Sequence, residues 1–189
     1  MCGRYLIDDD TYAGMWLLLN TPGKISEIVR GEVFPTNTAP IITHDGAAAA
    51  IWGFPHWKNS GVIINARSET ALQKNMFRGP LLERRCVIPS SGFYEWARTG
   101  GKKTKEKYLF RLPEATFLFM AGMFGVFREA SGGEYSAFVI LTTEANDSVA
   151  PVHDRMPVIL TPDEQSQWIG DAKFMEYALL RPGPKLVRA

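Results

Sequence analysis

Residues 85–96 read Arg-Cys-Val-Ile-Pro-Ser-Ser-Gly-Phe-Tyr-Glu-Trp, two runs of branched and aromatic residues separated by small, turn-forming ones. This pattern predicts two short β-strands, Arg85–Ile88 and Gly92–Trp96. Similar runs on both sides predict a chain dominated by β-structure. The further strands that we expect are Ala48–Phe54, Gly61–Ala66, Tyr108–Leu112, Phe117–Val126, Tyr135–Thr142 and Pro157–Leu160.

Turn and helix signals lie between these strands. Hairpin tips are expected at Gly100-Gly101 and Ser131-Gly132-Gly133, and a capping box with proline at the first helical position, Thr161-Pro162-Asp163-Glu164, predicts a helix that extends to about Gly170. The other expected helical segments are Asp10–Asn20, Ser68–Asn75 and Pro80–Arg84. We therefore predict one α+β domain, residues 1–189, with a mostly antiparallel, barrel-like β core and short peripheral helices.

The composition excludes several classes of protein. With 46% hydrophobic and 22% charged residues, the chain is typical of a globular domain, and no stretch approaches the length of a membrane helix. Two cysteines, Cys2 and Cys86, argue against a disulfide scaffold and favour a reducing compartment. No Cys/His spacing matches a metal motif. We expect a cytoplasmic monomer without metal, cofactor or membrane contact.

Cys2, directly after Met1, is the first candidate for chemistry. If Met1 is removed, this residue presents an α-amine with a reference pKa of about 7.7–8.0 and a thiol with one of about 8.5. Such a pair can capture an aldehyde as a Schiff base and close to a thiazolidine, or attack an amide carbonyl. The alternative is a frayed terminus without a role.

Asn65 and Arg67 stand where a predicted strand passes into a predicted helix. An amide can orient a substrate or nucleophile, and a guanidinium binds phosphate in a forked geometry. The structural alternative is that Asn65 and Ser68 cap the helix while Arg67 pairs with Glu69. The residues alone leave both interpretations open.

Glu95 and His153 are the candidates for proton transfer. Buried in its aromatic run, Glu95 would have a raised pKa and act as a general acid, whereas the alternative is an outward-facing residue on an alternating strand. His153 is followed by Asp154 and Arg155, and the other two histidines lack such neighbours.

Two surface features suggest a nucleic-acid partner without proving one. A basic run around residues 98–107 is either a phosphate-binding element or a solvated hairpin tip. Aromatic residues offer faces on which bases stack, although most aromatic residues in a domain of this size belong to the core. The candidates for stacking are Phe34, Trp52, Phe54, Trp57 and Trp96.

Five motifs in order resemble those of the SRAP family of abasic-site processing proteins, over a match from Cys2 to about Leu160. They are Met-Cys-Gly-Arg-Tyr, Asn-Ala-Arg-Ser-Glu-Thr, the 85–96 segment, Thr-Thr-Glu-Ala-Asn and His-Asp-Arg-Met-Pro. The loop at 52–57 is one residue shorter than is usual in that family, and the C-terminal residues 186–189 depart from its usual ending.

The resemblance implies an SRAP-like fold and a protein that binds single-stranded DNA containing abasic sites. It implies a covalent link to the abasic aldehyde through Cys2 after Met1 removal, an abasic-site lyase-like activity, and autocatalytic removal of Met1 by peptidase chemistry. The catalytic residues would be Cys2, Asn65, Glu95 and His153, and the DNA-binding residues Arg4, Arg67, Trp96, Thr142 and Arg155.

Three rival interpretations remain. Met-Cys-Gly also opens glutamine amidotransferase domains with an N-terminal nucleophile, although the chain has no room for the synthase module that these normally supply with ammonia. The second interpretation is a peptidase whose only substrate is its own Met1. The third is a protein that binds single-stranded DNA without a covalent step.

Overall fold

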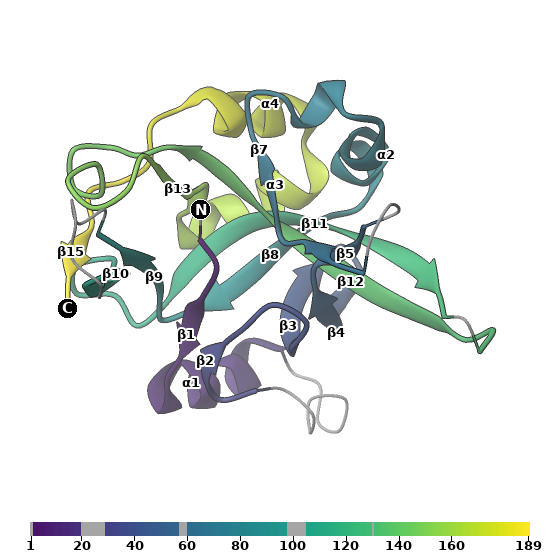
Figure 1. Ribbon diagram of the computed structural model, residues 1–189, viewed down its shortest axis with the longest axis horizontal. Coiled ribbons are helices and arrows are strands. Elements are labelled where there is room, and N and C mark those ends of the chain that lie inside the picture. Colours follow the sequence, from purple (N-terminus) through teal and green to yellow (C-terminus); the bar gives the residue numbers. More distant parts are fainter. Residues whose placement is uncertain (1, 20–28, 57–59, 98–104, 130) are drawn as a thin grey trace.

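A closed ring of five strands forms the centre of the molecule in the computed structural model, which describes residues 2–19, 29–56, 60–97, 105–129 and 131–189 (Figure 1). Around the ring each strand pairs with the next, and the long β11–β12 hairpin closes it. In ring order the strands are β3 (Thr38–Thr43), β8 (Arg85–Ser90), β11 (Leu118–Arg128), β12 (Glu134–Glu144) and β4 (Gly46–Trp52).

Shorter strands extend this barrel. β7 (Asn65–Arg67) runs parallel to β12, and β13 (Arg155–Pro157) and β14 (Ile159–Leu160) pair with β12 and β11. A small two-stranded sheet is formed by β5 (Phe54–Pro55) and β6 (Val62–Ile63). Almost all pairings are antiparallel, with parallel pairing only where β12 meets β4 and β7 among the described strands. The predicted mostly antiparallel, barrel-like core is therefore confirmed.

A second sheet carries the start of the described chain. Its strand order is β15-β10-β9-β1-β2, with all pairs antiparallel. The bounds are β1 (Tyr5–Ile7), β2 (Gly31–Val33), β9 (Gly92–Trp96), β10 (Lys107–Arg111) and β15 (Val187–Arg188). Gly92 is required where β9 meets β10, because a Cβ there would lie 2.4 Å from the carbonyl oxygen of Phe110.

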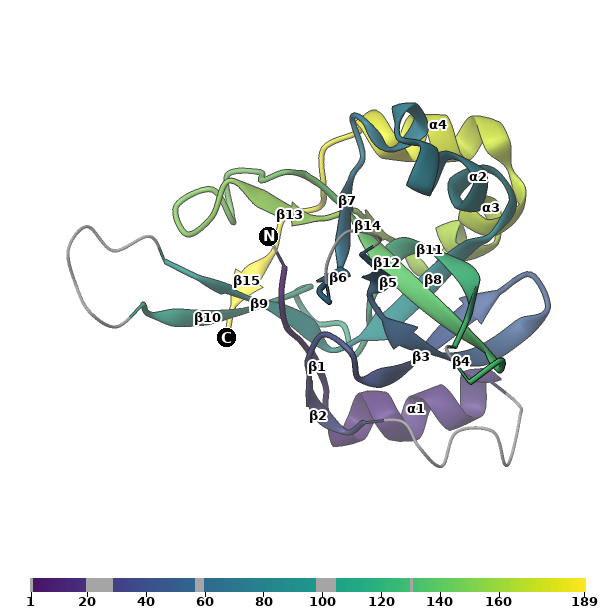
Figure 2. The ribbon, with the colours of Figure 1, turned by 45° about the vertical axis from the view of Figure 1, so that its right-hand side comes forward.

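Helices cover the barrel on two sides. α1 lies on one side, and α2, α3 and α4 gather on the other (Figure 2). The helices are α1 (Asp9–Leu19), α2 (Asn75–Glu83), α3 (Gln165–Gly170) and α4 (Ala172–Leu180), with 3₁₀ turns at Ala71–Gln73 and Pro162–Glu164. The predicted capping box is confirmed: the backbone N–H of Thr161 donates to Glu164 over 2.8 Å.

Strand residues alternate between two cores because successive side chains point to opposite faces. On β8, Cys86 and Ile88 face a core that also holds Cys2 and Trp52, whereas Val87 faces the core beneath the helices. Both faces of the barrel strands are buried, which explains why the sequence shows near-continuous apolar runs there.

Some expectations were wrong. A helix over 68–75 does not form, because the N–H of Ser68 donates to Thr142 and continues the β7–β12 ladder, so α2 begins only at Asn75. The predicted strand Pro157–Leu160 divides between two partners at Val158. Sequence patterns missed β1, β2, β3, β15 and α4. Gly100-Gly101 and Trp57 lie outside the described residues.

Candidate functional site

Cys2 lies inside the molecule although it stands at the start of the chain. Tyr5 pairs with Phe93, and the N–H of Tyr94 donates to the carbonyl of Arg4 over 2.9 Å, so this segment follows β9 toward Glu95. The Cys2 side chain has no exposed surface, and its Sγ lies 3.6 Å from the carbonyl oxygen of Arg4. The alternative of a frayed terminus is therefore wrong for Cys2.

Asn65 fixes the backbone of Cys2. Its Nδ2 donates to the Cys2 carbonyl over 2.8 Å, from a position on β7 held in register with Ile140 of β12. The Oδ1 of Asn65 is buried, and no donor in the described part of the chain reaches it. An acceptor is thus open beside Cys2. Asn65 orients Cys2 rather than capping a helix.

The Cys2 thiol is neutral in these surroundings. Burial raises its pKa far above the usual value, and the negative charge of Glu95 raises it further. A buried thiol is a poor nucleophile until it loses its proton. If this residue reacts as a mature N-terminus, its amine is the better first nucleophile.

Glu95 is 2% exposed on β9, so the interpretation as an outward-facing strand residue is wrong. Desolvation by burial raises the pKa of this carboxyl, which favours the protonated form. Its Oε2 lies 3.9 Å from Nε2 of His153. A carboxyl and an imidazole therefore stand together next to the buried thiol.

His153 has a defined orientation. Its Nδ1 accepts a hydrogen bond from the N–H of Arg155 over 3.0 Å, and the same nitrogen lies 3.0 Å from Oδ1 of Asp154. The ring therefore presents Nε2 to Glu95, while Nδ1 is held between the backbone of Arg155 and the side chain of Asp154. His153 is thus the imidazole that faces the buried carboxyl.

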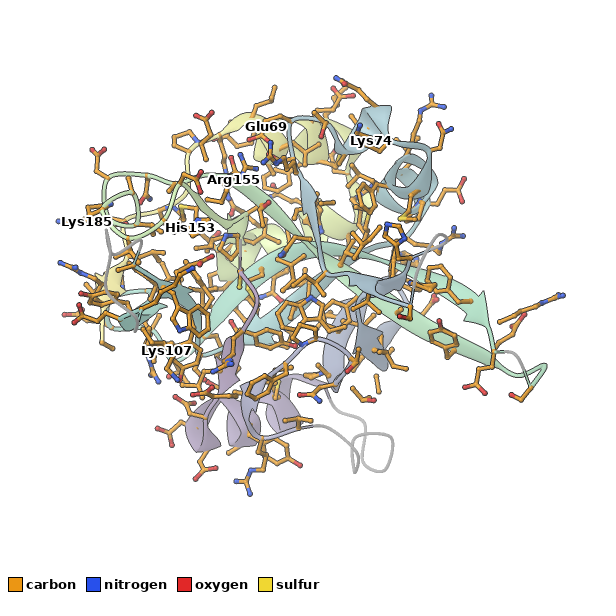
Figure 3. The ribbon with its side chains drawn as sticks, in the orientation of Figure 1. Glu69, Lys74, Lys107, His153, Arg155 and Lys185 are labelled. Carbon is orange, nitrogen blue, oxygen red and sulfur yellow. The ribbon has the colours of Figure 1, made fainter. Side chains whose placement is uncertain are left out.

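Arg155 is anchored next to His153. Its guanidinium makes a bidentate ion pair with Glu69, at 2.6 and 2.9 Å, and donates to the carbonyl of Thr142 at 2.6 Å. Figure 3 shows Glu69, Arg155 and His153 close together. Thr142 itself is completely buried. Glu69 thus pairs with Arg155, and Arg67 on β7 is exposed.

Arg4 lies on a partly open surface beside Cys2. Its guanidinium carbon is 4.2 Å from the centre of the Phe34 ring and 5.0 Å from that of Trp96, and its Nη1 is 2.9 Å from Glu32. Phe34 is 41% exposed, whereas Trp52 and Phe54 are buried in the two cores. Of the described stacking candidates, Phe34 and Trp96 therefore remain available.

Sequence reasoning missed Glu32, and its structural alternative paired Glu69 with Arg67 rather than with Arg155. Both pairings join residues that are remote in sequence, so no local pattern predicts them. The described residues contain no group of three or more His, Cys, Asp or Glu side chains suited to a metal ion. Within the described chain, no helix is long and apolar enough to cross a membrane.

Buried Cys2, the amide of Asn65 on its carbonyl and the Glu95–His153 pair form a candidate site. Its groups are of the kinds that nucleophilic or proton-transfer chemistry uses. The model of the SOS response associated peptidase (SRAP) family matches residues 1–186, and the chain belongs to this family. Its motifs and fold therefore have a common origin with those of the relatives below.

Among the relatives, the abasic site processing protein YoqW of Bacillus subtilis is 34% identical over 96% of this chain and 87% of its own. YoaM of the same organism, also named an abasic site processing protein, is 33% identical over 89% of this chain and 79% of its own. A crystal structure from Bacteroides thetaiotaomicron shares the fold, with a TM-score of 0.85 at 24% identity, covering 99% of this chain and 90% of its own.

Proposed function

We propose that this protein processes abasic sites by binding single-stranded DNA and linking covalently to the ring-opened aldehyde through Cys2, after removal of Met1. The observation that carries the proposal is the position of Cys2, buried with its carbonyl held by Asn65 and its thiol within the electrostatic reach of Glu95. Relatives named as abasic site processing proteins support the choice of substrate.

The proposed reaction needs no cofactor, because Cys2 and the aldehyde supply every atom of the new bonds. The Cys2 amine adds to the aldehyde carbon, and the resulting carbinolamine loses water to give an iminium ion. The thiol then adds to the same carbon and gives up its proton, which closes a thiazolidine. One C–N and one C–S bond form, and the aldehyde oxygen leaves as water.

Glu95 and His153 have roles that their geometry suits. A protonated Glu95 carboxyl can donate to the deoxyribose ring oxygen as the sugar opens, and to the departing hydroxyl of the carbinolamine. His153, 3.9 Å away, can return a proton to Glu95 or accept one from the thiol. Asn65 keeps the Cys2 backbone in place during both additions.

Incubation with an abasic single-stranded oligonucleotide, followed by a denaturing gel, tests the proposal. We expect a shifted band with the abasic strand, none with the intact strand and none with Cys2→Ala. An undiminished, denaturation-resistant band from Cys2→Ala would refute it. An amidotransferase, a peptidase limited to Met1 or a noncovalent binding protein would give no such band, and a mass spectrum of the intact protein establishes whether Met1 is gone.

A further inference from the structure

Two cations converge on one carboxylate beside the site, Arg4 from the residue that precedes β1 and Lys107 from β10. Glu32 on β2 receives Nη1 of Arg4 on Oε2 at 2.9 Å and Nζ of Lys107, at the start of β10, on Oε1. Since β9 and β1 lie between β10 and β2, the three side chains meet across the width of the sheet. Figure 3 shows Lys107 on this part of the molecule, near β9 and β10.

Aromatic rings hold both cations. Arg4 lies over Phe34 and Trp96, and the Lys107 ammonium lies 4.3 Å from the centre of the Tyr94 ring. Tyr94 and Trp96 are two residues apart on β9, so their side chains project from the same face of the sheet. The cations are thus presented on an aromatic surface, the combination by which proteins follow a single-stranded backbone.

The charges on this surface do not cancel. Arg4 and Lys107 contribute two positive charges, and Glu32 contributes one negative charge. The Lys107 ammonium and the Arg4 guanidinium hold the pKa of the Glu32 carboxyl below its usual value, so it is ionised at neutral pH. The side chains of Arg4, Glu32 and Lys107 are 27%, 30% and 37% exposed, which leaves them accessible to an anion from solvent.

A carboxylate with two oxygens on two cations has the charge and the paired acceptors of a phosphodiester. We propose that Arg4 and Lys107 form a binding site for one backbone phosphate of single-stranded DNA, and that Glu32 occupies this site until the phosphate displaces it. This inference rests on the proposed function for the kind of nucleic acid. It adds Lys107 to the contact surface and gives Glu32 a role in selectivity.

The exchange limits the affinity for undamaged DNA. A phosphate gains the two cations only by displacing an existing ion pair, so the net electrostatic gain is that of about one charge. Arg4 is two residues from Cys2, so a phosphate bound there is close to the reacting nucleotide. The lasting attachment then comes from the covalent step at Cys2, which only an aldehyde allows.

The test compares single-residue variants for binding to an intact oligothymidine by fluorescence anisotropy at several salt concentrations. Glu32→Gln should bind more tightly than the wild type and steepen the slope of log affinity against log salt by about 0.7, and Lys107→Gln should weaken binding and flatten it by about 0.7. The advantage of Glu32→Gln should therefore shrink about fivefold for each tenfold rise in salt.

Glu134→Gln is the matched control, because it removes the same charge from an exposed pair with Arg128 near the tip of the β11–β12 hairpin. It should leave binding unchanged. Equal effects of Glu32→Gln and Glu134→Gln would overturn the inference, as would weaker binding by a Glu32→Gln protein with an unchanged melting temperature. If Glu32→Gln has a lower melting temperature than the wild type, Lys107→Gln decides instead. A Lys107→Gln protein that binds like the wild type would overturn the inference.

Failure of the proposed function gives a different result. A wild-type protein that forms no adduct with abasic DNA, but shows these salt-dependent differences, would refute the covalent step and leave the phosphate site standing. In a competition assay, intact single strands should inhibit adduct formation by Glu32→Gln at lower concentrations than they inhibit the wild type.

Discussion

The side-chain amide of Asn65 donates to the main-chain carbonyl of Cys2 over 2.8 Å, across 63 positions of sequence. Asn65 is itself fixed by β7, whose parallel pairing with β12 ties it to the barrel. A strand paired with the central barrel thus holds the main chain of Cys2. A terminal segment that would otherwise be mobile gains a defined position, as a reacting group requires.

Asn65→Ala should slow adduct formation by about 10²-fold, since even a displacement of about 1 Å in a reacting group has such an effect. Binding to intact single strands should change little. Ser68→Ala is a suitable control, because the Ser68 hydroxyl is buried without a hydrogen-bond partner among the described residues. Equal adduct rates for the wild type and Asn65→Ala, measured on denaturing gels, would show that Cys2 is positioned by other contacts.

The raised pKa of the Cys2 thiol predicts the order of bond formation. If the amine reacts first, Cys2→Ser should still form an imine that borohydride traps, at a rate close to that of the wild type. Without borohydride it should give at most a reversible product, because oxygen closes the ring less favourably than sulfur. A Cys2→Ser protein that borohydride cannot trap would indicate that the thiol attacks first.

Glu95→Gln should slow adduct formation by about 10²–10⁴-fold, the usual contribution of a general acid or base. The amide has nearly the same shape, so affinity for intact single strands should stay the same. His153→Ala should also alter imine formation or its reversal and spare binding. Equal losses of binding and rate in Glu95→Gln would mark this residue as structural. Full rates in both variants would mean that the amine and thiol suffice.

The sequence predicted the barrel strands β4, β8, β11 and β12 and missed β3. The signal was clearest for β11 and β12, which have 11 residues each and are rich in branched and aromatic side chains. The sequence could not predict β1, β2 or β15, which have only two or three residues each and are held by partners far away in the chain. The helix expected over 68–75 failed for a related reason. Tertiary hydrogen bonding at Ser68 outweighed a local helix signal.

The sequence indicated which residues belong to the candidate site, but it could not predict which of them contact one another. Local sequence left Glu95 undecided between burial and exposure, and only the packing of β9 between β1 and β10 determines that it is buried. The family resemblance predicted that Arg155 binds DNA, and this stays a prediction. Its bidentate pairing with Glu69 depends on contact across 86 positions, which no motif reveals.

These pairings predict different effects for two arginines. Arg67→Ala should flatten the slope of log affinity against log salt by about 0.7, as expected for loss of one phosphate contact to a single strand. Arg155→Ala should flatten it less, because Glu69 already balances much of that charge. It should instead lower the free energy of unfolding by about 1.5–3 kcal/mol, because Glu69 and the carbonyl of Thr142 lose hydrogen bonds from a charged guanidinium. Anisotropy titrations and denaturant unfolding measure the two effects, and equal changes in slope would argue against the compensating role of Glu69.

Burial of Glu95 also predicts how stability depends on pH. The folded protein raises the pKa of this carboxyl above the value of about 4.3 expected in the unfolded chain. Below about pH 4 the group is protonated in both states and makes no difference. As the pH rises, the unfolded chain releases the proton more readily, so the folded state loses stability until its own carboxyl ionises. Glu95→Gln removes this loss, so its melting temperature should exceed that of the wild type by more at pH 7 than at pH 4. A difference that is constant across this range, or larger at pH 4, would show that the folded protein does not favour the protonated carboxyl and would remove Glu95 as the acid.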